Sequence, residues 1–461
     1  MRDYLLFAII IGLVPVILMR PWVGILAWFW VGLMAPHSLT WGFMRSFPVA
    51  MIIAAVTLFA FLTARDKRPM PKSQLMTLLF VWVGWVTLTT AVAVNPNAWG
   101  FWVHFMKIML ITFVAPLLIF GPGRIIALLL VITGSLAFYG FKGGLFAVST
   151  GGAHMVLGPD GSYLSGNTYI GIAMIMVLPA ILVSARLFHR RWVEFGSKFL
   201  QRYSRLLGLF GYAVFWLTAV AILATYSRGA LLGLLAIAPF MFLRMQRKIV
   251  LVTLAVIAFG VIGVTAPERL TERWSTIESY EEDRSAMQRI QAWGVNWNMA
   301  LDRPLVGMGF RNAGMGYDWW IQYAEFEGDW THVLSPHSIY FSVLGNHGFV
   351  GLALYLALMI GTLLALNRIR KEARDQPGRI WLSEYAWALQ IGLLGYLAAG
   401  AFLDVAYFNL LYAFIALAVV MQRELAQGAE QAGSTAPDDR RARGVPQPRF
   451  REFVVRDERG Q

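Results

Sequence analysis

The sequence predicts an all-α protein that crosses a membrane many times, and its composition leads to this fold class. Of the 461 residues, 58% are hydrophobic and only 14% are charged, whereas soluble domains carry roughly 25% charged residues. The apolar residues also occur in stretches close to the length of about 20 residues that a helix needs to cross a bilayer. Soluble loops and tails are therefore minor parts of the chain.

Eleven apolar stretches follow one another along most of the chain. Before them, residues 4–36 lack a small-residue cleavage site, so they are interpreted as retained membrane helix and not as a signal peptide. The sequence RPW at 20–22 interrupts this segment, which predicts one crossing plus a partial or re-entrant piece and about twelve spans in total. The eleven stretches are residues 48–64, 74–93, 102–120, 124–139, 168–188, 206–225, 229–243, 249–265, 338–366, 382–401 and 405–421.

Four short basic stretches separate some of these spans: 65–72, 186–205, 244–248 and 368–379. Together they hold 18 Lys or Arg and only 4 Asp or Glu. Threading the spans in order places all four on one side, which the positive-inside rule makes cytoplasmic. The net charge of +13 then reflects topology and contact with anionic membrane lipids, and it gives no reason to expect nucleic acid as a partner.

The loops on the opposite, outer side are unequal. The largest, 266–336, contains 11 acidic and 6 basic side chains, and a second, 140–167, is rich in glycine. We therefore expect five parts. They are N-terminal transmembrane helices (1–205), transmembrane helices that carry the sequence TYSRG (206–265), the large outer loop (266–336), C-terminal transmembrane helices (337–422) and a disordered cytoplasmic tail (423–461).

The first stretch with candidate chemistry is TYSRGALLG, residues 225–233, which joins two spans through a tight outer turn. Arg228 is expected at the lipid–water boundary, followed by Gly229, which allows unusual backbone angles. A snorkelling arginine at a helix end is the simpler alternative.

The second is an amphipathic helix expected within 281–312 and ended by Pro304 and two glycines. Arg284 and Arg289 leave this helix on other faces than the apolar one, and a solvated helix face is the alternative explanation for both. The apolar side chains that recur at steps of three and four are Met287, Ile290, Trp293, Trp297 and Leu301.

The third is SPHSIY, which begins with Ser335, Pro336 and His337 and runs into a long apolar span. Ser335 suits an N-cap and Pro336 the first helical position, so His337 is expected in the first turn. The positive end of a helix disfavours a protonated imidazole and attracts phosphate, so a neutral His337 could accept a proton. The alternative is a polar residue at a helix start with no chemical role.

Other candidates are weaker. His104 and Lys107 share a face near the outer end of one span, where Lys107 could pair with a lipid phosphate. Glu325, Glu327 and Asp329 could hold a divalent ion, although acidic loops are usually only solvated. The chain has no cysteine, which excludes disulfides and thiol nucleophiles, and it has no Asp-x-Asp pair, glycine-rich nucleotide loop or HExxH sequence.

Taken in order, TYSRGALLG, RIQAW, RPLVGMGF and PHSIYFSVLGNHGFVG resemble the O-antigen ligase/polymerase family of bacterial envelopes, over roughly residues 206–366. The N-terminal half resembles a subgroup of O-glycosylation ligases linked to exosortase systems. The resemblance implies a GT-C-like glycosyltransferase of the bacterial inner membrane with its active site facing the periplasm. Its donor would be a glycan on undecaprenyl diphosphate and its acceptor a lipid A–core sugar.

Carried over by motif, Arg228 and Arg289 would bind the diphosphate and His337 would be the essential histidine, with Arg284 as the rival of Arg289 and Lys107 as a further phosphate contact. Two arginines can do for a diphosphate what a metal does elsewhere, so no metal or cofactor is expected. Three alternatives remain: a protein O-oligosaccharyltransferase, a repeat-unit polymerase and, outside enzymes, a transporter of lipid-linked glycans.

Overall fold

The computed structural model describes residues 1–193, 197–244, 284–325, 332–376 and 378–434. These residues form an all-helical protein, as predicted, and their only bridge of strand type joins Gly158 and Gly166. The α-helices are α1 (Arg2–Met19), α2 (Pro21–Met34), α3 (Val49–Thr63), α4 (Gln74–Ala91), α5 (Ala98–Leu118), α6 (Gly121–Ser149), α7 (Asn167–His189), α8 (Lys198–Leu223), α9 (Arg228–Arg244), α12 (Arg284–Asp302), α13 (Tyr317–Trp320), α14 (Ile339–Arg374), α15 (Ile380–Gly400) and α16 (Asn409–Ser434).

Eight of the described helices are long and apolar enough to cross a membrane, which makes the chain a multi-pass membrane protein. They are α1, α4, α5, α6, α7, α8, α14 and α16. The N-terminal segment forms two helices that meet at Arg20, because Pro21 begins α2. The predicted span 249–265 lies outside the described residues, and the total of about twelve spans stays a prediction.

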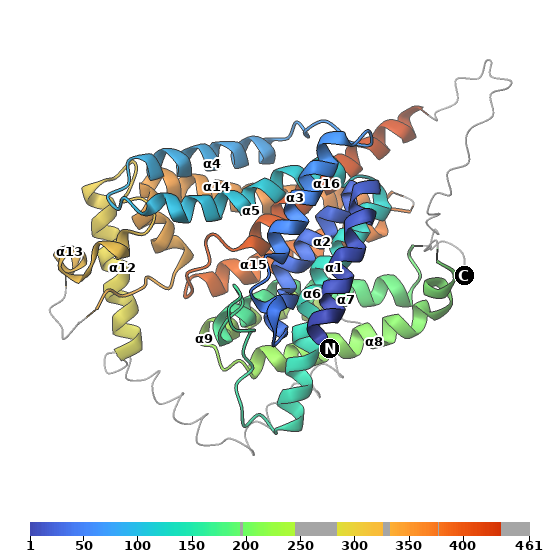
Figure 1. Ribbon diagram of the computed structural model, residues 1–461, viewed down its shortest axis with the longest axis horizontal. Coiled ribbons are helices and arrows are strands. Elements are labelled where there is room, and N and C mark those ends of the chain that lie inside the picture. Colours follow the sequence, from blue (N-terminus) through green and yellow to red (C-terminus); the bar gives the residue numbers. More distant parts are fainter. Residues whose placement is uncertain (194–196, 245–283, 326–331, 377, 435–461) are drawn as a thin grey trace.

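The bundle has a long axis, along which α4, α5, α14 and α16 run (Figure 1). In its interior α7 packs against α8 and α15, and 89% of its apolar stretch is buried. A helix that meets other helices on every side is apolar all round, which explains why the sequence of α7 shows no polar face.

Several helices are longer than the apolar stretches from which the membrane spans were predicted. Residues at helix ends that face water keep good helix propensity when they are Lys, Arg, Glu, Gln or Ala, so the helix continues until a glycine, proline or capping residue stops it. Three helices extend in this way: α8 and α14 into the basic stretches, and α16 from Arg423 to Ser434 in the predicted tail. Helix α6 also continues into the predicted loop 140–167, through Gly140, Gly143 and Gly144.

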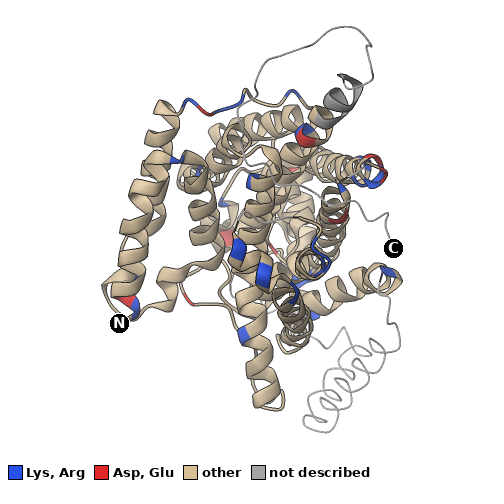
Figure 2. Cartoon of the chain, turned by 90° about the vertical axis from the view of Figure 1, so that its right-hand side faces the viewer, with Lys and Arg blue, Asp and Glu red and all other residues tan. Residues whose placement is uncertain are grey.

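The connections gather at two ends of the bundle. At the first, here called the loop end, the backbone N–H of Val94 donates to the carbonyl of Met308 at 3.0 Å, and the Tyr226 hydroxyl donates to the carbonyl of Gly152 at 2.5 Å. The opposite end, here called the basic end, holds the described parts of the four basic stretches (Figure 2). The loop end consists of residues 92–97, 150–166, 224–227, the described part of 284–338, and 401–408.

Candidate active site

The helix predicted within the large loop is present as α12, but its buried face differs from the predicted one. Ala292, Val295 and Met299 are fully buried, whereas Trp297 and Leu301 are exposed by 44% and 55%. The small side chains allow α12 to approach α14 closely. The predicted apolar face was wrong because the tryptophans act from the edge of this contact: Trp297 meets Phe349 edge-on at 5.4 Å.

The segment RPLVGMGF forms backbone hydrogen bonds with the kinked part of α14. Gly348 inside α14 has a φ of 70°, and this kink leaves two carbonyl groups without helical partners. The N–H of Met308 donates to the carbonyl of Gly345 at 2.9 Å, and the N–H of Gly309 donates to that of Asn346 at 2.8 Å. Positive φ angles at Gly307 and Gly309 make this path possible. The segment thereby brings Arg311 and Asn312, which follow it, beside α14.

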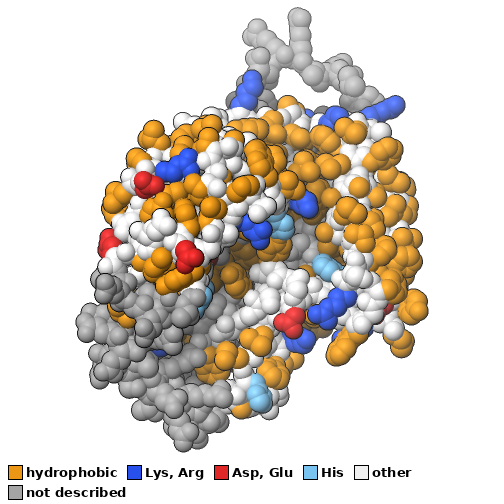
Figure 3. Space-filling model, turned by 60° about the vertical axis from the view of Figure 1, so that its left-hand side comes forward, with side chains coloured by type: hydrophobic (Ala, Val, Ile, Leu, Met, Phe, Trp, Pro, Cys, Tyr) orange, Lys and Arg blue, Asp and Glu red, His pale blue; other side chains and the backbone are white. Residues whose placement is uncertain are grey.

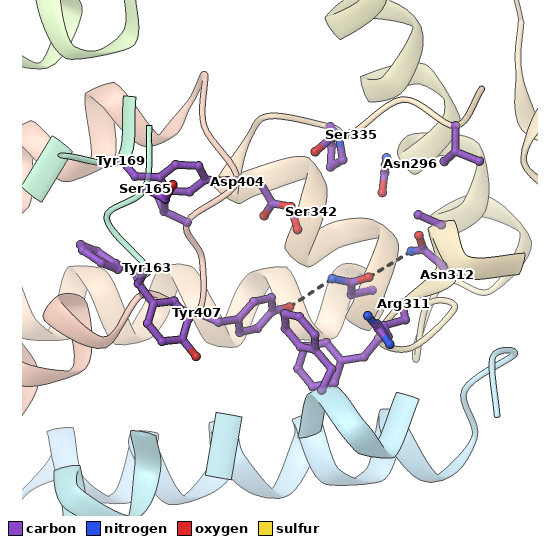
Figure 4. A pocket seen from close by; sticks show the side chains of 18 of the residues that line it. Tyr163, Ser165, Tyr169, Asn296, Arg311, Asn312, Ser335, Ser342, Asp404 and Tyr407 are labelled. Atoms are coloured by element: carbon purple, nitrogen blue, oxygen red, sulfur yellow. Dashed lines mark hydrogen bonds between the residues drawn. The ribbon is translucent and has the colours of Figure 1, made fainter. Parts of the chain in front are cut away.

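A cavity of about 570 Å³ opens at the loop end between α12, α14, the connection 150–166 and the connection 401–408. Figure 3 shows a hollow on this side of the molecule with basic and histidine side chains near its edges. Inside, the Asn312 amide donates to the Asn346 side chain at 3.0 Å, and the Asn346 amide donates to the Tyr407 hydroxyl at 3.3 Å (Figure 4). Further polar side chains of the lining are those of Asn296, Arg311, Ser335, Ser342 and Asp404.

Asp404 is an acidic group of the cavity that the sequence analysis missed. It lies in the connection between α15 and α16, where its carboxylate accepts a hydrogen bond from the Ser342 hydroxyl (Figure 4). Burial raises the pKa of Asp404, and the bond from Ser342 opposes that rise. One signal could have found it: a lone acidic residue between the apolar stretches 382–401 and 405–421.

His337 stands before the helix and not in its first turn. Its φ of 42° is left-handed, α14 begins at Ile339, and Ser338 occupies the N-cap position. The prediction of Ser335 as N-cap was therefore wrong. The indole N–H of Trp293 donates to the carbonyl of Pro336 at 2.7 Å, which ties the segment to α12 ahead of the turn.

The surroundings of His337 favour its neutral form. The ring is exposed, yet the neighbouring protein shields it in part, and this partial burial is the larger cause that lowers the pKa of His337. The positive charge of Arg289 is the second cause, so Arg289 lies within electrostatic range of His337. Ser335 and Pro336, directly before His337, line the cavity, whereas the side chain of His337 is not part of the lining.

Arg228 reaches the same region from α9. It is an exposed first residue of that helix, after Ser227, whose hydroxyl accepts from the N–H of Ala230 at 3.2 Å. A methyl group on Gly229 would lie 3.8 Å from Cβ of Phe402, whose ring in turn lies 6.0 Å from that of Trp293. The elements that carry Arg228, Arg289 and His337 therefore meet around Trp293 and Phe402.

Gly229 does not supply the unusual backbone angle that we expected there. It lies inside α9 with ordinary angles, and the left-handed residue of the turn is Tyr226, with a φ of 51°. It faces the end of α15, where a methyl group would lie 3.5 Å from the Ala399 carbonyl oxygen, an ordinary contact that does not require glycine.

The remaining predicted residues lie at or beyond the edge of the site. Lys107 is exposed and is not part of the cavity lining, although the ring of His104, one turn before it, lies 5.2 Å from the lining residue Tyr163. The side chain of Arg284 lies outside the described residues, as do Glu327 and Asp329. Glu325 accepts a hydrogen bond from Asn298 at 3.1 Å. Among the described side chains, no group of three or more His, Asp or Glu could hold a metal ion.

A second histidine, His347, packs against Phe310, which lines the cavity. Its Nδ1 lies 2.7 Å from the Thr89 hydroxyl, and its ring is packed edge-on against Phe310 at 4.9 Å. It is fully buried. His347 therefore fixes Phe310 and the neighbouring Asn346 in place, which is a structural role for the sequence NHG.

Residues 213–356 match the family model described as O-antigen ligase. This match, which covers less than half of the chain, supports membership of the O-antigen ligase family. The matched region contains Arg228, Arg289 and His337, and it supports glycosyltransferase activity of the ligase or polymerase type. Residues 1–189 match a family of unknown function (DUF5935). No curated protein matches the chain.

Proposed function

We propose that this O-antigen ligase family member transfers a glycan from undecaprenyl diphosphate to a sugar hydroxyl of lipid A–core, in the bacterial inner membrane and on its periplasmic side. One observation carries the proposal: His337 directly follows two lining residues of a polar cavity and lies within electrostatic range of Arg289, in the region that matches the family. A base beside a cation suits an attack by a hydroxyl group on a carbon whose leaving group is an anion.

In this proposal His337 is the general base. Burial and the charge of Arg289 both hold the pKa of His337 below its usual value, so the ring is neutral near pH 7 and can accept a proton. The acceptor oxygen bonds to the anomeric carbon while the bond from that carbon to the diphosphate oxygen breaks. The hydroxyl proton passes to His337, and a single displacement of this kind inverts the configuration.

The arginines take the leaving group. Negative charge grows on the diphosphate as the C–O bond breaks, and a guanidinium group can bind two phosphate oxygens at once. Arg289 and Arg228 come from elements that meet at Phe402, which favours a shared ligand. Arg284 and Lys107 stay proposed as additional phosphate contacts, the latter next to His104 at the edge of the cavity.

The cavity itself is proposed to hold sugar. Amide, hydroxyl and carboxylate groups donate and accept hydrogen bonds in the way that a polyhydroxylated ligand requires, and the rings of Tyr407 and Phe310 offer apolar faces. The carboxylate of Asp404 can accept a bond from a sugar hydroxyl while Ser342 keeps it in position.

The test is a reconstituted transfer reaction. Purified protein in nanodiscs receives one undecaprenyl diphosphate-linked glycan together with lipid A–core, a Ser/Thr-rich peptide, or a second lipid-linked glycan, and the products are separated by mass. Transfer to lipid A–core alone supports the ligase. Transfer only to the peptide or to the second glycan would assign protein glycosylation or polymerisation, and movement of the donor across the bilayer without transfer would assign transport.

The proposed reaction needs no metal ion, because the arginines supply the positive charge. We expect glycan transfer to continue at an unchanged rate in excess EDTA. Loss of transfer with EDTA and its recovery with Mg²⁺ would contradict this and would direct attention to Glu325, Glu327 and Asp329.

A further inference from the structure

A second cavity lies at the basic end, at the opposite end of the bundle from the candidate active site. It has a volume of about 670 Å³ and lies between the connection from α3 to α4, Arg368 of α14 and the middle of α16. Two candidate spans end here, since α4 begins at Gln74 and the apolar part of α16 stops at Gln427. The cavity therefore stands at the level where a bilayer surface would meet the protein.

Four cationic side chains line this cavity, and none of its lining residues is acidic: they are Arg68, Lys72, Arg368 and Arg423. Among the described residues, only Arg368 has a carboxylate partner, Glu372, at 2.6 Å. Asp66, the acidic residue of the same connection, is engaged by Arg124. Among the described side chains, Glu372 pairs with Arg368 and Glu424 acts electrostatically on Arg423, so the lining as a whole keeps an excess of positive charge.

Arg423 places an unsatisfied hydrogen-bond donor in the lining of this cavity. Its Nη2 donates to the carbonyl of Ile119 at 2.6 Å, while its Nη1 is buried without a hydrogen-bond partner in the described part of the chain. A buried guanidinium nitrogen without a partner is costly, and an anion in the cavity would satisfy it.

The start of α4 adds to the positive potential. Ser73 caps this helix of 18 residues by accepting from the N–H of Met76 at 3.2 Å, and the first turn holds no acidic residue. Lys72 stands directly before the cap, where the positive end of the helix dipole disfavours a cation unless an anion is bound.

An apolar cavity of about 840 Å³ adjoins the basic one and shares residues 70–74 with it. Its other lining residues are Met76, Thr77, Leu78 and Phe80 of α4, of which Thr77 and Phe80 are exposed. A free phosphate ion would occupy only the basic cavity. A phospholipid could place its charged headgroup in the basic cavity and an acyl chain in the apolar one.

We propose that these two cavities form a binding site for an anionic phospholipid, with the headgroup phosphate among Arg68, Lys72 and Arg423 and an acyl chain along α4. This site lies outside the region that matches the O-antigen ligase family. A lipid bound there would contact both the connection between α3 and α4 and helix α16, and would link them at the membrane surface.

The experiment measures thermal unfolding of the full-length protein in detergent with added phosphatidylglycerol, phosphatidylcholine or inorganic phosphate. We expect phosphatidylglycerol to raise the unfolding temperature and the other two to leave it unchanged. In Lys72→Gln the phosphatidylglycerol concentration for half of the effect rises about fivefold, and in Arg68→Gln/Lys72→Gln it rises further. Lys72 is exposed and forms no ion pair among the described residues, so we expect this variant to fold normally.

Lys198→Gln is the matched control, because Lys198 is an exposed lysine of the basic end that lies outside both cavities. Its response to phosphatidylglycerol should equal that of the wild type. Equal losses in Lys198→Gln and Lys72→Gln would reduce the effect to general surface charge and overturn the site. A full shift with inorganic phosphate alone would assign the basic cavity to a free anion, and a full shift with phosphatidylcholine would remove the role of headgroup charge.

Discussion

The two ends of the bundle use charge in opposite ways. At the loop end the cavity is lined mostly by neutral amides and hydroxyls, and Arg228, Arg289 and His337 lie on the elements that meet near it. At the basic end some charges line one cavity and others form ion pairs. Arg186, for example, lies 3.5 Å from Glu384, with side chains that are only 12% and 13% exposed. A charged side chain that is already paired, such as Arg186 with Glu384, is less available to a ligand and mainly supports the packing of the helices.

This contrast explains why the number of charged residues at one end of the bundle does not indicate where the candidate active site lies. The basic end holds most of the arginines of the four basic stretches, and Glu384 alone binds both Arg186 and Arg244. Such pairs hold α7, α9 and α15 together, although a buried pair adds little stability once the cost of removing two charges from water is included.

The largest expected difference between the ends is which side of the membrane each faces. In this cysteine-free chain, His332→Cys at the loop end should react with a membrane-impermeant thiol reagent in spheroplasts, and Ser197→Cys at the basic end should react only after permeabilisation. Both positions are exposed, so access to the reagent depends on the membrane alone. Labelling of Ser197→Cys in intact spheroplasts, with His332→Cys unlabelled, would reverse the proposed orientation.

Next in size is the loss of the base. His337→Ala should lower single-turnover glycan transfer by roughly 10²–10⁴-fold while binding of the lipid-linked donor is retained. His337→Asn should give the same loss, and it keeps a residue that tolerates the left-handed φ of 42° at this position. His332→Ala, five residues earlier and also exposed, is the control and should be fully active. Wild-type rates in both His337 variants would end the assignment.

The arginines should show smaller losses that include binding. Arg228→Ala and Arg289→Ala each remove a charge-assisted contact to the diphosphate, so donor affinity and transfer should each fall about 10- to 100-fold. Lysine at either site restores the charge without the planar fork and should recover only part of the activity. The same substitution at the basic end, Arg190→Ala, should change neither quantity. Normal donor affinity in the Arg228 and Arg289 variants would remove the diphosphate from this part of the proposal.

The smallest effect concerns pH. Since a general base works in its neutral form, activity should fall as pH decreases through the pKa of His337, which burial and Arg289 hold below 6.5. Arg289→Gln removes one of the two causes, so the acidic limb of kcat/KM should move up toward 6.5 without reaching it. Profiles from about pH 5 to about pH 8 test this, with Arg190→Gln as the control. If the acidic limb of kcat/KM moves to lower pH or stays unchanged in Arg289→Gln, Arg289 does not lower the pKa of His337 and the proposed electrostatic link between the two residues is wrong.

Particular residues show how far the sequence could lead to the site. The motif order led to Arg228, Arg289 and His337, and the structure brings their elements together. It could not place His337 correctly, because whether a helix begins at Pro336 or at Ile339 depends on the bond from Trp293 to the Pro336 carbonyl, which joins residues 43 positions apart. For the same reason the sequence analysis overlooked Asp404, whose meaning comes from Ser342 on another helix.

The sequence by itself determined the helical, membrane-spanning class and the positions of the described spans, because backbone groups in a bilayer must be satisfied within a helix and this requires long apolar runs. It also determined which segments carry positive charge. Only the tertiary structure decided which face of α12 is buried, where α14 bends, and that Asn312, Asn346, Asp404 and Tyr407 share one cavity. Those outcomes depend on close packing between segments distant in the chain, and neither periodicity nor hydropathy records which surfaces fit each other.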